Sequence, residues 1–167
     1  ANANGNAWSN PAPDPADAAP YDRLLVALGL VMTLPGLPVL YYGDEVGLAG
    51  GTDPDNRRVL PEEGALSLSQ RRVLDGTRRL GRLRACSSAL KAGNRKAFLT
   101  TKRTYGFTRV ADAEAAVVLV SIESETAQIV PPLKAVPPGL YVDALSAESF
   151  EIGGGAPVPV APYSLRI

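Results

Sequence analysis

The chain has 167 residues, 46% of them apolar, and its 17 basic and 17 acidic residues leave no net charge. It contains no run of about 18 apolar residues and starts without the charged and apolar segments of a signal peptide, so we expect neither a membrane span nor a secretion signal here. Histidine is absent, which excludes a His-based triad or His metal site in these residues; the single cysteine, Cys86, excludes an internal disulfide and is expected to be buried.

Residues 1–16 are rich in Asn, Ala and Pro and lack periodicity, which predicts a loop. In this loop, Trp8 either anchors the segment on the body of the protein or offers a flat surface to a sugar ring. A helix is predicted from about Asp17, which caps it, to Leu34, because apolar residues recur at helical spacing until Pro35-Gly36 stops them. The helix is apolar around most of its circumference, so other structure must cover it.

The apolar run Val39-Leu40-Tyr41-Tyr42 shows no polar alternation, which predicts a strand over 38–43 that is buried on both faces, as in a parallel sheet or barrel. Polar side chains at the carboxyl end of such a strand are where α/β proteins bind their ligands. We therefore expect any chemistry of this chain in the long loop from Gly43 to about Leu68, which holds Asp44, Glu45, Asp53, Asp55, Asn56 and Arg57.

A second helix is predicted over about Ser69–Ala85, with a shorter turn to Ala92, a cap at Ser67 or Ser69, and close packing at Gly76. Residues 61–110 hold twelve basic and three acidic residues, a bias that is compatible with nucleic-acid binding. Since the arginines share a helix with an apolar face, we favour a solvated helix surface and expect no nucleic-acid partner.

The pattern changes after Gly93-Asn94 from helical spacing to short apolar runs separated by turn residues, which predicts an antiparallel sandwich. Within it, Val117–Val120 should form the most buried strand. The eight predicted strands lie near 95–101, 104–111, 115–122, 126–131, 139–144, 147–152, 156–160 and 162–167.

The stretch around the first loop resembles the α-amylase family of glycoside hydrolases. Members of that family typically read GIPVIYYGDEIG at the last barrel strand, followed in many cases by GGxDPxNR. This chain reads GLPVLYYGDEVG over 36–47 and GGTDPDNR over 50–57. The resemblance implies that residues 17–93 form the last helix, strand and helix of a TIM (β/α)8 barrel, and that residues 94–167 form the all-β sandwich called domain C.

The same resemblance implies that the catalytic acids lie upstream, so no catalytic residue is expected in this chain. Asp44 and Glu45 then have structural or rim roles. Asp53 and Arg57 match positions that contact substrate sugars on the glycone side; the alternative is that they only pair with each other to hold the loop. No metal and no cofactor is expected in this segment, and the calcium need of a complete enzyme stays open.

The implied function is that of the carboxyl-terminal portion of a retaining hydrolase or transglycosylase that acts on α-glucans such as starch and maltooligosaccharides. Its expected partners are the sugar substrate and the rest of the barrel, because one strand out of eight cannot bury its own faces; neither nucleic acid nor membrane is expected. The alternatives are a noncatalytic carbohydrate-binding or interaction module and a noncatalytic relative associated with a transporter. Compartment is left open.

Overall fold

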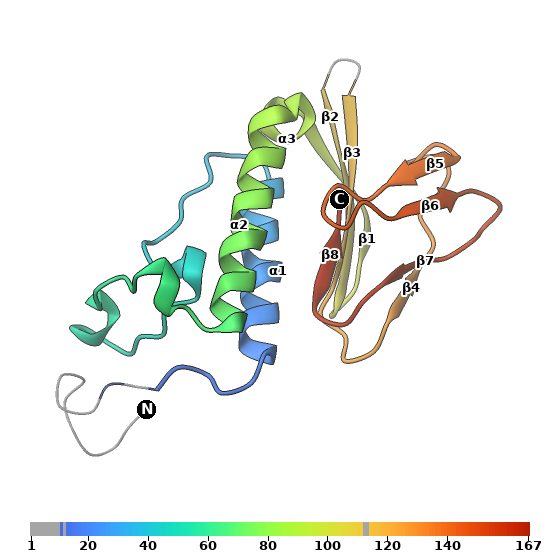
Figure 1. Cartoon of the computed structure of the whole chain (residues 1–167). Coiled ribbons are helices and arrows are strands. Elements are labelled where there is room, and N and C mark those ends of the chain that lie inside the picture. Colours follow the sequence, from blue (N-terminus) through green and yellow to red (C-terminus); the bar gives the residue numbers. More distant parts are fainter. Residues whose placement is uncertain (1–10, 12, 112–113) are drawn as a thin grey trace.

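The computed structural model describes residues 11, 13–111 and 114–167. Figure 1 shows two helices packed side by side, with the strands on one side of them and a long loop on the other. The helices are α1 (Ala19–Thr33), α2 (Leu68–Cys86) and α3 (Ser88–Ala92), and the loop holds the short 3-10 turns η1 (Asp44–Val46), η2 (Asp55–Arg57) and η3 (Glu63–Ala65). None of the helices in the described part of the chain combines the length and apolar character that a membrane crossing requires.

Helix α1 lies where the apolar spacing predicts it, with Pro20 in its first turn. Its N-cap is Ala18, one residue later than predicted, and the carboxylate of Asp17 accepts a hydrogen bond of 3.1 Å from the backbone N–H of Ala19. Asp17 therefore still satisfies one free donor of the first turn. Trp8 and most of the predicted loop 1–16 lie outside the described residues.

Helix α2 starts with a capping box, in which the Ser67 hydroxyl accepts from the Gln70 N–H and the Gln70 side chain accepts from the Ser67 N–H. The predicted close packing at Gly76 is confirmed, because a Cβ there would lie 2.5 Å from Cδ2 of Leu25 on α1. The two helices share a core cluster that consists of Tyr21, Leu28, Met32, Val73 and Leu80.

All eight predicted strands are present, and each of their ends lies within two residues of the prediction. They form a four-stranded sheet in the order β1-β2-β3-β8 and two two-stranded sheets, β4-β7 and β5-β6, all antiparallel. The strands are β1 (Asn94–Thr100), β2 (Thr104–Ala111), β3 (Glu114–Ser121), β4 (Ala127–Ile129), β5 (Gly139–Val142), β6 (Ser149–Ile152), β7 (Val158–Val160) and β8 (Ser164–Arg166). The predicted antiparallel architecture is thus confirmed.

The sheet and the helices share one core. Of the stretch Val117–Val120, predicted to form the most buried strand, Val118, Leu119 and Val120 are buried and Val117 is half-buried. Val26 of α1 joins Val118 and Val120 in one cluster with Phe107 of β2. On the other side of the sheet a second cluster fills the space toward the strand pairs and consists of Leu119, Ile129, Val136, Ile152, Val158 and Val160. The division of the chain into a barrel segment (17–93) and a domain C (94–167) stays a prediction.

The predicted buried strand over 38–43 is wrong for this structure. These residues form no strand, and most of the apolar side chains in and beside the run are exposed: Leu37 by 87%, Val39 by 76%, Tyr41 by 50% and Tyr42 by 41%. Leu40 is half-buried and packs against the core cluster of the two helices. A parallel strand bonds only to strands that come from elsewhere in a sheet, and the described residues offer none beside this segment. The apolar run is therefore an uncovered surface rather than a core strand.

Two further expectations about side chains need correction. Arg84 does not belong to the solvated face of α2, because it is buried and donates to the carbonyl oxygens of Met32, at 2.7 Å, and Leu34, at 3.2 Å. Its guanidinium thus caps the carboxyl end of α1, where a cation is favourable. Cys86 is exposed rather than buried.

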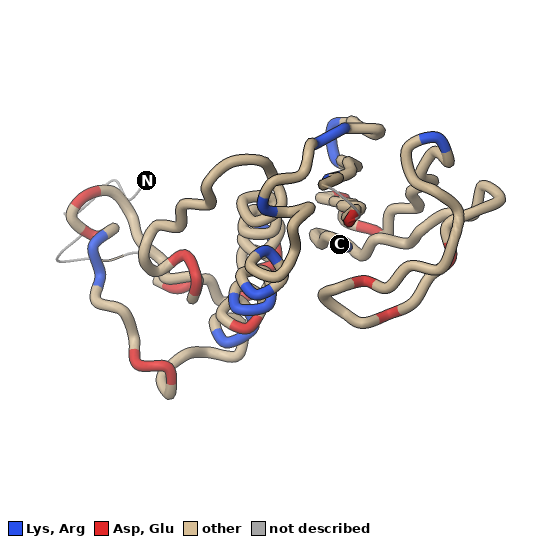
Figure 2. Tube along the Cα trace, turned by 90° about the horizontal axis from the view of Figure 1, so that it is seen from above, with Lys and Arg blue, Asp and Glu red and all other residues tan. Residues whose placement is uncertain are grey.

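The other arginines of α2 are exposed, and Figure 2 shows in blue how positive residues recur along that helix. Most are engaged within the chain: Arg72 pairs with Asp22, Arg78 pairs with Glu63, and Arg79 donates to the carbonyl of Leu145. This arrangement agrees with a solvated helix face. The absence of a nucleic-acid partner stays a prediction.

Candidate functional site

The candidate site lies in the loop between α1 and α2, on the side of the helices that faces away from the sheets (Figure 1). The first turn of this loop is made possible by Gly43 and Gly47, whose φ angles of 95° and 62° are in the region that favours glycine. Between them, the Glu45 carboxylate accepts a hydrogen bond of 2.7 Å from the Gly43 N–H. Glu45 is thus engaged in holding the turn, which agrees with the structural role that the resemblance implies.

Asp53 and Arg57 lie together on the outer part of the loop. Nη2 of Arg57 is 2.9 Å from Oδ1 of Asp53, and the two side chains are 70% and 62% exposed, respectively. The structure therefore contains the ion pair of the alternative reading. It also leaves both groups accessible to solvent, and their contact with a sugar stays a prediction.

A second ion pair lies inside the same loop, with its carboxylate buried and its guanidinium half-buried. Nε and Nη2 of Arg58 donate to the two carboxylate oxygens of Asp55 at 2.6 and 2.7 Å. Oδ2 of Asp55 also accepts from the N–H of Gly51 at 2.7 Å. The Asp55 side chain is 4% exposed, and the hydrogen bonds that Arg58 donates to Asp55 are the main reason why the pKa of Arg58 is raised. We call these three groups the Gly51–Asp55–Arg58 clasp.

Sequence reasoning placed Asp55 among the polar residues of the loop and passed over Arg58. The sequence does show an acid and an arginine three residues apart, Asp55 and Arg58. This spacing alone does not reveal that the Asp55 carboxylate is buried. The adjacent glycines are explained by the clasp: a Cβ at Gly51 would lie 3.2 Å from Asp55 Oδ2, and one at Gly50 would lie 3.1 Å from Asn56 Cα. Their small size lets the chain close on itself.

Two tyrosines border the loop. The rings of Tyr41 and Tyr42 lie 4.9 Å apart, tilted by 43°, and the Tyr41 hydroxyl donates a long hydrogen bond of 3.4 Å to the carbonyl of Asn56. The pKa of Tyr42 is raised, first by desolvation and then by the neighbouring Tyr41, while Arg57 acts in the opposite direction.

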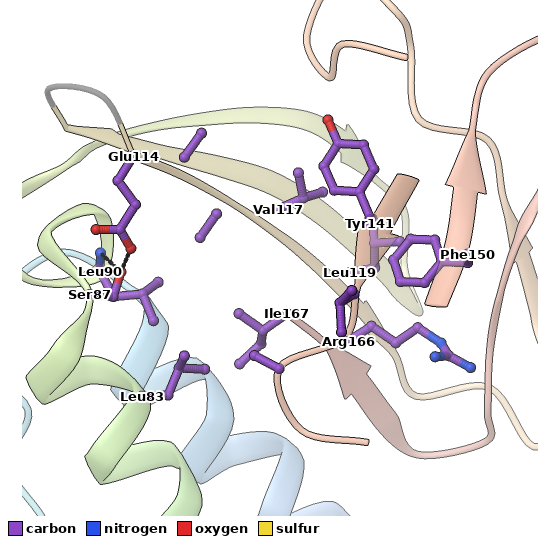
Figure 3. Close-up of a pocket in the computed structure, with 14 residues that line it drawn as sticks. Leu83, Ser87, Leu90, Glu114, Val117, Leu119, Tyr141, Phe150, Arg166 and Ile167 are labelled. Carbon is purple, nitrogen blue, oxygen red and sulfur yellow. Dashed lines mark hydrogen bonds between the residues drawn. The ribbon is translucent and has the colours of Figure 1, made fainter. Parts of the chain in front are cut away.

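A cavity of about 200 Å³ lies elsewhere, between the helices and strands β3, β5 and β6 (Figure 3). Its two charged side chains are already engaged. Glu114 accepts from the hydroxyls of Ser87 and Ser88 and from the Ser88 N–H, which lowers its pKa from 4.5 to about 2. Arg166 pairs with Asp143 and Glu148. Because these groups hold the fold together, the cavity does not compete with the loop as the candidate site.

No protein-family model matches the sequence. The chain is 37% identical to an amylopullulanase of Thermoanaerobacter thermohydrosulfuricus over 90 residues, which are 52% of this chain and 6% of that enzyme. It is 28% identical to a cyclomaltodextrin glucanotransferase of Niallia circulans over 138 residues, 80% of this chain and 19% of the relative. The chain thus spans less than a fifth of the length of these two relatives.

Among solved structures, the α-amylase of Geobacillus thermoleovorans in complex with acarbose superimposes with a TM-score of 0.78. The match covers 88% of this chain and 32% of that one, at 23% sequence identity. At this identity the likeness concerns the fold.

Proposed function

We propose, on the premise that this chain corresponds to the carboxyl-terminal part of an α-amylase family enzyme, that the enzyme is a retaining hydrolase or transglycosylase of starch-type α-glucans. Both relatives are named for action on such glucans, and the similar α-amylase was solved with acarbose bound. Retaining glycosidases use a pair of carboxyl groups on either side of the scissile bond. In our proposal these acids lie in another part of the enzyme.

The role that we propose for this segment is to supply a substrate-binding loop. Asp53 offers carboxylate oxygens that accept hydrogen bonds from sugar hydroxyls, and Arg57 offers several donors in a fixed planar fork. Both side chains are largely exposed, at 62% and 70%. An exposed ion pair of this kind contributes only about 0–1 kcal/mol, so a sugar can replace either partner at small cost.

The observation that carries the proposal is the uncovered apolar surface directly before the loop. Leu37 and Val39 are more than three-quarters exposed, although side chains of this kind are normally buried. Contiguous exposed apolar surface marks a place where another part of a protein packs. We propose that the remaining strands of the barrel cover it, which would also place the Asp53–Arg57 pair at the rim of the barrel.

The alternative of a noncatalytic carbohydrate-binding module has one observation in its favour, namely the partly exposed pair Tyr41–Tyr42. Against it, the aromatic side chains of the β region are buried or half-buried, so the strands present no aromatic platform to a glucan. The six residues concerned are Phe98, Tyr105, Phe107, Tyr141, Phe150 and Tyr163.

The test uses the complete gene product that contains these residues, assayed on maltooligosaccharides of defined length. Asp53→Ala and Arg57→Ala should each raise KM by about tenfold, the loss of one hydrogen bond to a charged group. Glu63→Gln removes the charge of another exposed acid in an ion pair, Glu63–Arg78, and serves as the control. Unchanged KM and kcat in both site variants would remove Asp53 and Arg57 from the substrate-binding site.

A further inference from the structure

The loop contains two ion pairs of opposite character, and only one of them is built to hold a conformation. The Asp53–Arg57 pair has a single short contact and lies in solvent. The Asp55–Arg58 pair has two parallel hydrogen bonds, and the carboxylate is 4% exposed. Bidentate pairs out of water are geometrically defined, whereas exposed pairs are screened and exchange partners readily.

The clasp encloses the exposed pair. Asp55 binds Gly51 on one side and Arg58 on the other, so it joins the two ends of the segment 51–58 that contains Asp53 and Arg57. Two backbone bonds tighten the same segment, from the Asp55 N–H to the Thr52 carbonyl at 2.9 Å and from the Arg57 N–H to the Pro54 carbonyl at 3.0 Å. The positions of Asp53 and Arg57 are thus set by contacts that neither of their side chains makes.

We propose that Asp55 is a positioning residue: through the Gly51–Asp55–Arg58 clasp it holds Asp53 and Arg57 in the geometry that binds the sugar. This inference rests on the proposed function. It also assigns different tasks to the two pairs. Because the clasp maintains the loop, the exposed pair is not needed for this purpose, and its groups are available to exchange their mutual contact for sugar hydroxyls.

The test compares KM and kcat of Asp55→Asn in the complete gene product, in two backgrounds. Asn keeps the shape of Asp but loses the charge and one acceptor, so the loop loosens while the exposed pair is chemically intact. In the otherwise native enzyme KM for maltooligosaccharides should rise about tenfold with kcat nearly unchanged. In a background that carries both Asp53→Ala and Arg57→Ala the same substitution should change KM less than twofold, because the two groups it positions are already gone.

Arg58→Lys is the milder second variant in case Asp55→Asn does not fold. Lysine keeps the charge but loses the planar fork, and KM should rise again without loss of kcat. Glu63→Gln, in the exposed pair that Glu63 of the loop forms with Arg78 of α2, is the matched control and should leave KM unchanged.

The possible results distinguish the positioning role of Asp55 from the proposed substrate-binding role of Asp53 and Arg57. A rise of KM that disappears in the background carrying both Asp53→Ala and Arg57→Ala supports the positioning role. A lower Tm without a change in KM, or an equal rise of KM in both backgrounds, overturns it and leaves the proposed function intact. If Arg57→Ala and Asp53→Ala themselves leave KM and kcat unchanged, the substrate-binding assignment fails, and the positioning role fails with it.

Discussion

Arg109, in the middle of strand β2, donates a hydrogen bond of 2.5 Å to the carbonyl oxygen of Thr33, the last residue of helix α1. Its Nε donates to the Gly93 carbonyl at 2.9 Å, and the residue is only 1% exposed. Burial lowers the pKa of Arg109, followed by the nearby positive charges of Arg84 and Arg95. The buried cation is compensated by main-chain carbonyls, including one at the negative end of a helix.

Replacing this cation should therefore destabilise the fold strongly. Arg109→Met leaves the Thr33 and Gly93 carbonyls without their donor, and we expect a loss of about 2–4 kcal/mol in the free energy of unfolding. Urea denaturation followed by circular dichroism measures it. Arg82→Met is the control, since Arg82 is exposed on α2, and should stay within about 0.5 kcal/mol of the native chain. Equal effects of both substitutions would contradict the structural role of Arg109.

Replacing either of two glycines by alanine should change the free energy of unfolding, but in opposite directions. A Cβ at Gly93 would lie 2.4 Å from the Ala89 carbonyl oxygen and 2.9 Å from the backbone of Val110, and backbone cannot move aside cheaply. Gly93→Ala should lower the free energy of unfolding by about 2–3 kcal/mol. Gly81 lies inside helix α2, and a Cβ there would meet no other atom within 4 Å. Because alanine favours the helix more than glycine does, Gly81→Ala should raise the free energy of unfolding by about 0.5–1 kcal/mol. Thermal unfolding of the two variants distinguishes them, and shifts of the same sign would refute the packing argument.

Glu114 should make the fold less stable in acid. Its pKa in the folded chain is about 2, below the ordinary value of 4.5, because the hydroxyls of Ser87 and Ser88 bind the ionised form. The unfolded chain therefore takes up this proton at higher pH than the folded chain does. The stabilisation is complete above about pH 4.5 and is lost as the pH falls toward 2.

The corresponding measurement is Tm as a function of pH for Glu114→Gln and the native chain. The variant should melt lower at pH 7, and the gap between the two curves should narrow below pH 4.5. Glu125→Gln, at an exposed position of the following turn, should follow the native curve throughout. A gap that is as wide at pH 3 as at pH 7 would show that Glu114 does not act through its charge.

The uncovered apolar run gives a prediction that depends on context. In the 167-residue chain expressed alone, Leu37→Asn and Val39→Asn should change the free energy of unfolding by less than about 0.5 kcal/mol, since both side chains are exposed. In the complete gene product, where we propose that they are covered, each should cost about 1.5–3 kcal/mol. Thermal unfolding of both proteins compares the two contexts. If the substitutions were equally harmless in both, the surface would not be the one that packs on the rest of the barrel.

Sequence reasoning succeeded where the signal is local. The short apolar runs and the turn residues between them located every predicted strand of the β region. The cap at Ser67 and the close approach at Gly76 follow equally from local chemistry. These features need no knowledge of the rest of the fold, because each one is decided within a few residues.

It failed where the partner is distant. The run 38–43 is apolar enough for a buried strand, but strand formation needs neighbours that the described chain does not provide. Arg84 and Arg109 resemble surface arginines in sequence, and the carbonyls that hold them lie 52 and 76 residues away in Met32 and Thr33. Within the site, Asp53 and Arg57 were identified through the family resemblance. The buried carboxylate of Asp55 was not singled out, because a buried residue in a loop produces no periodic sequence pattern.

Strand β1 borders the four-stranded sheet and is bonded only to β2 among the described strands. An outer strand of this kind is a template on which a neighbouring molecule can add its own strand and start aggregation. Here the first four residues of β1 are exposed and include Arg95 and Lys96. An approaching strand would have to bring its side chains against two adjacent positive charges, so the border of the sheet repels copies of itself while the protein stays folded.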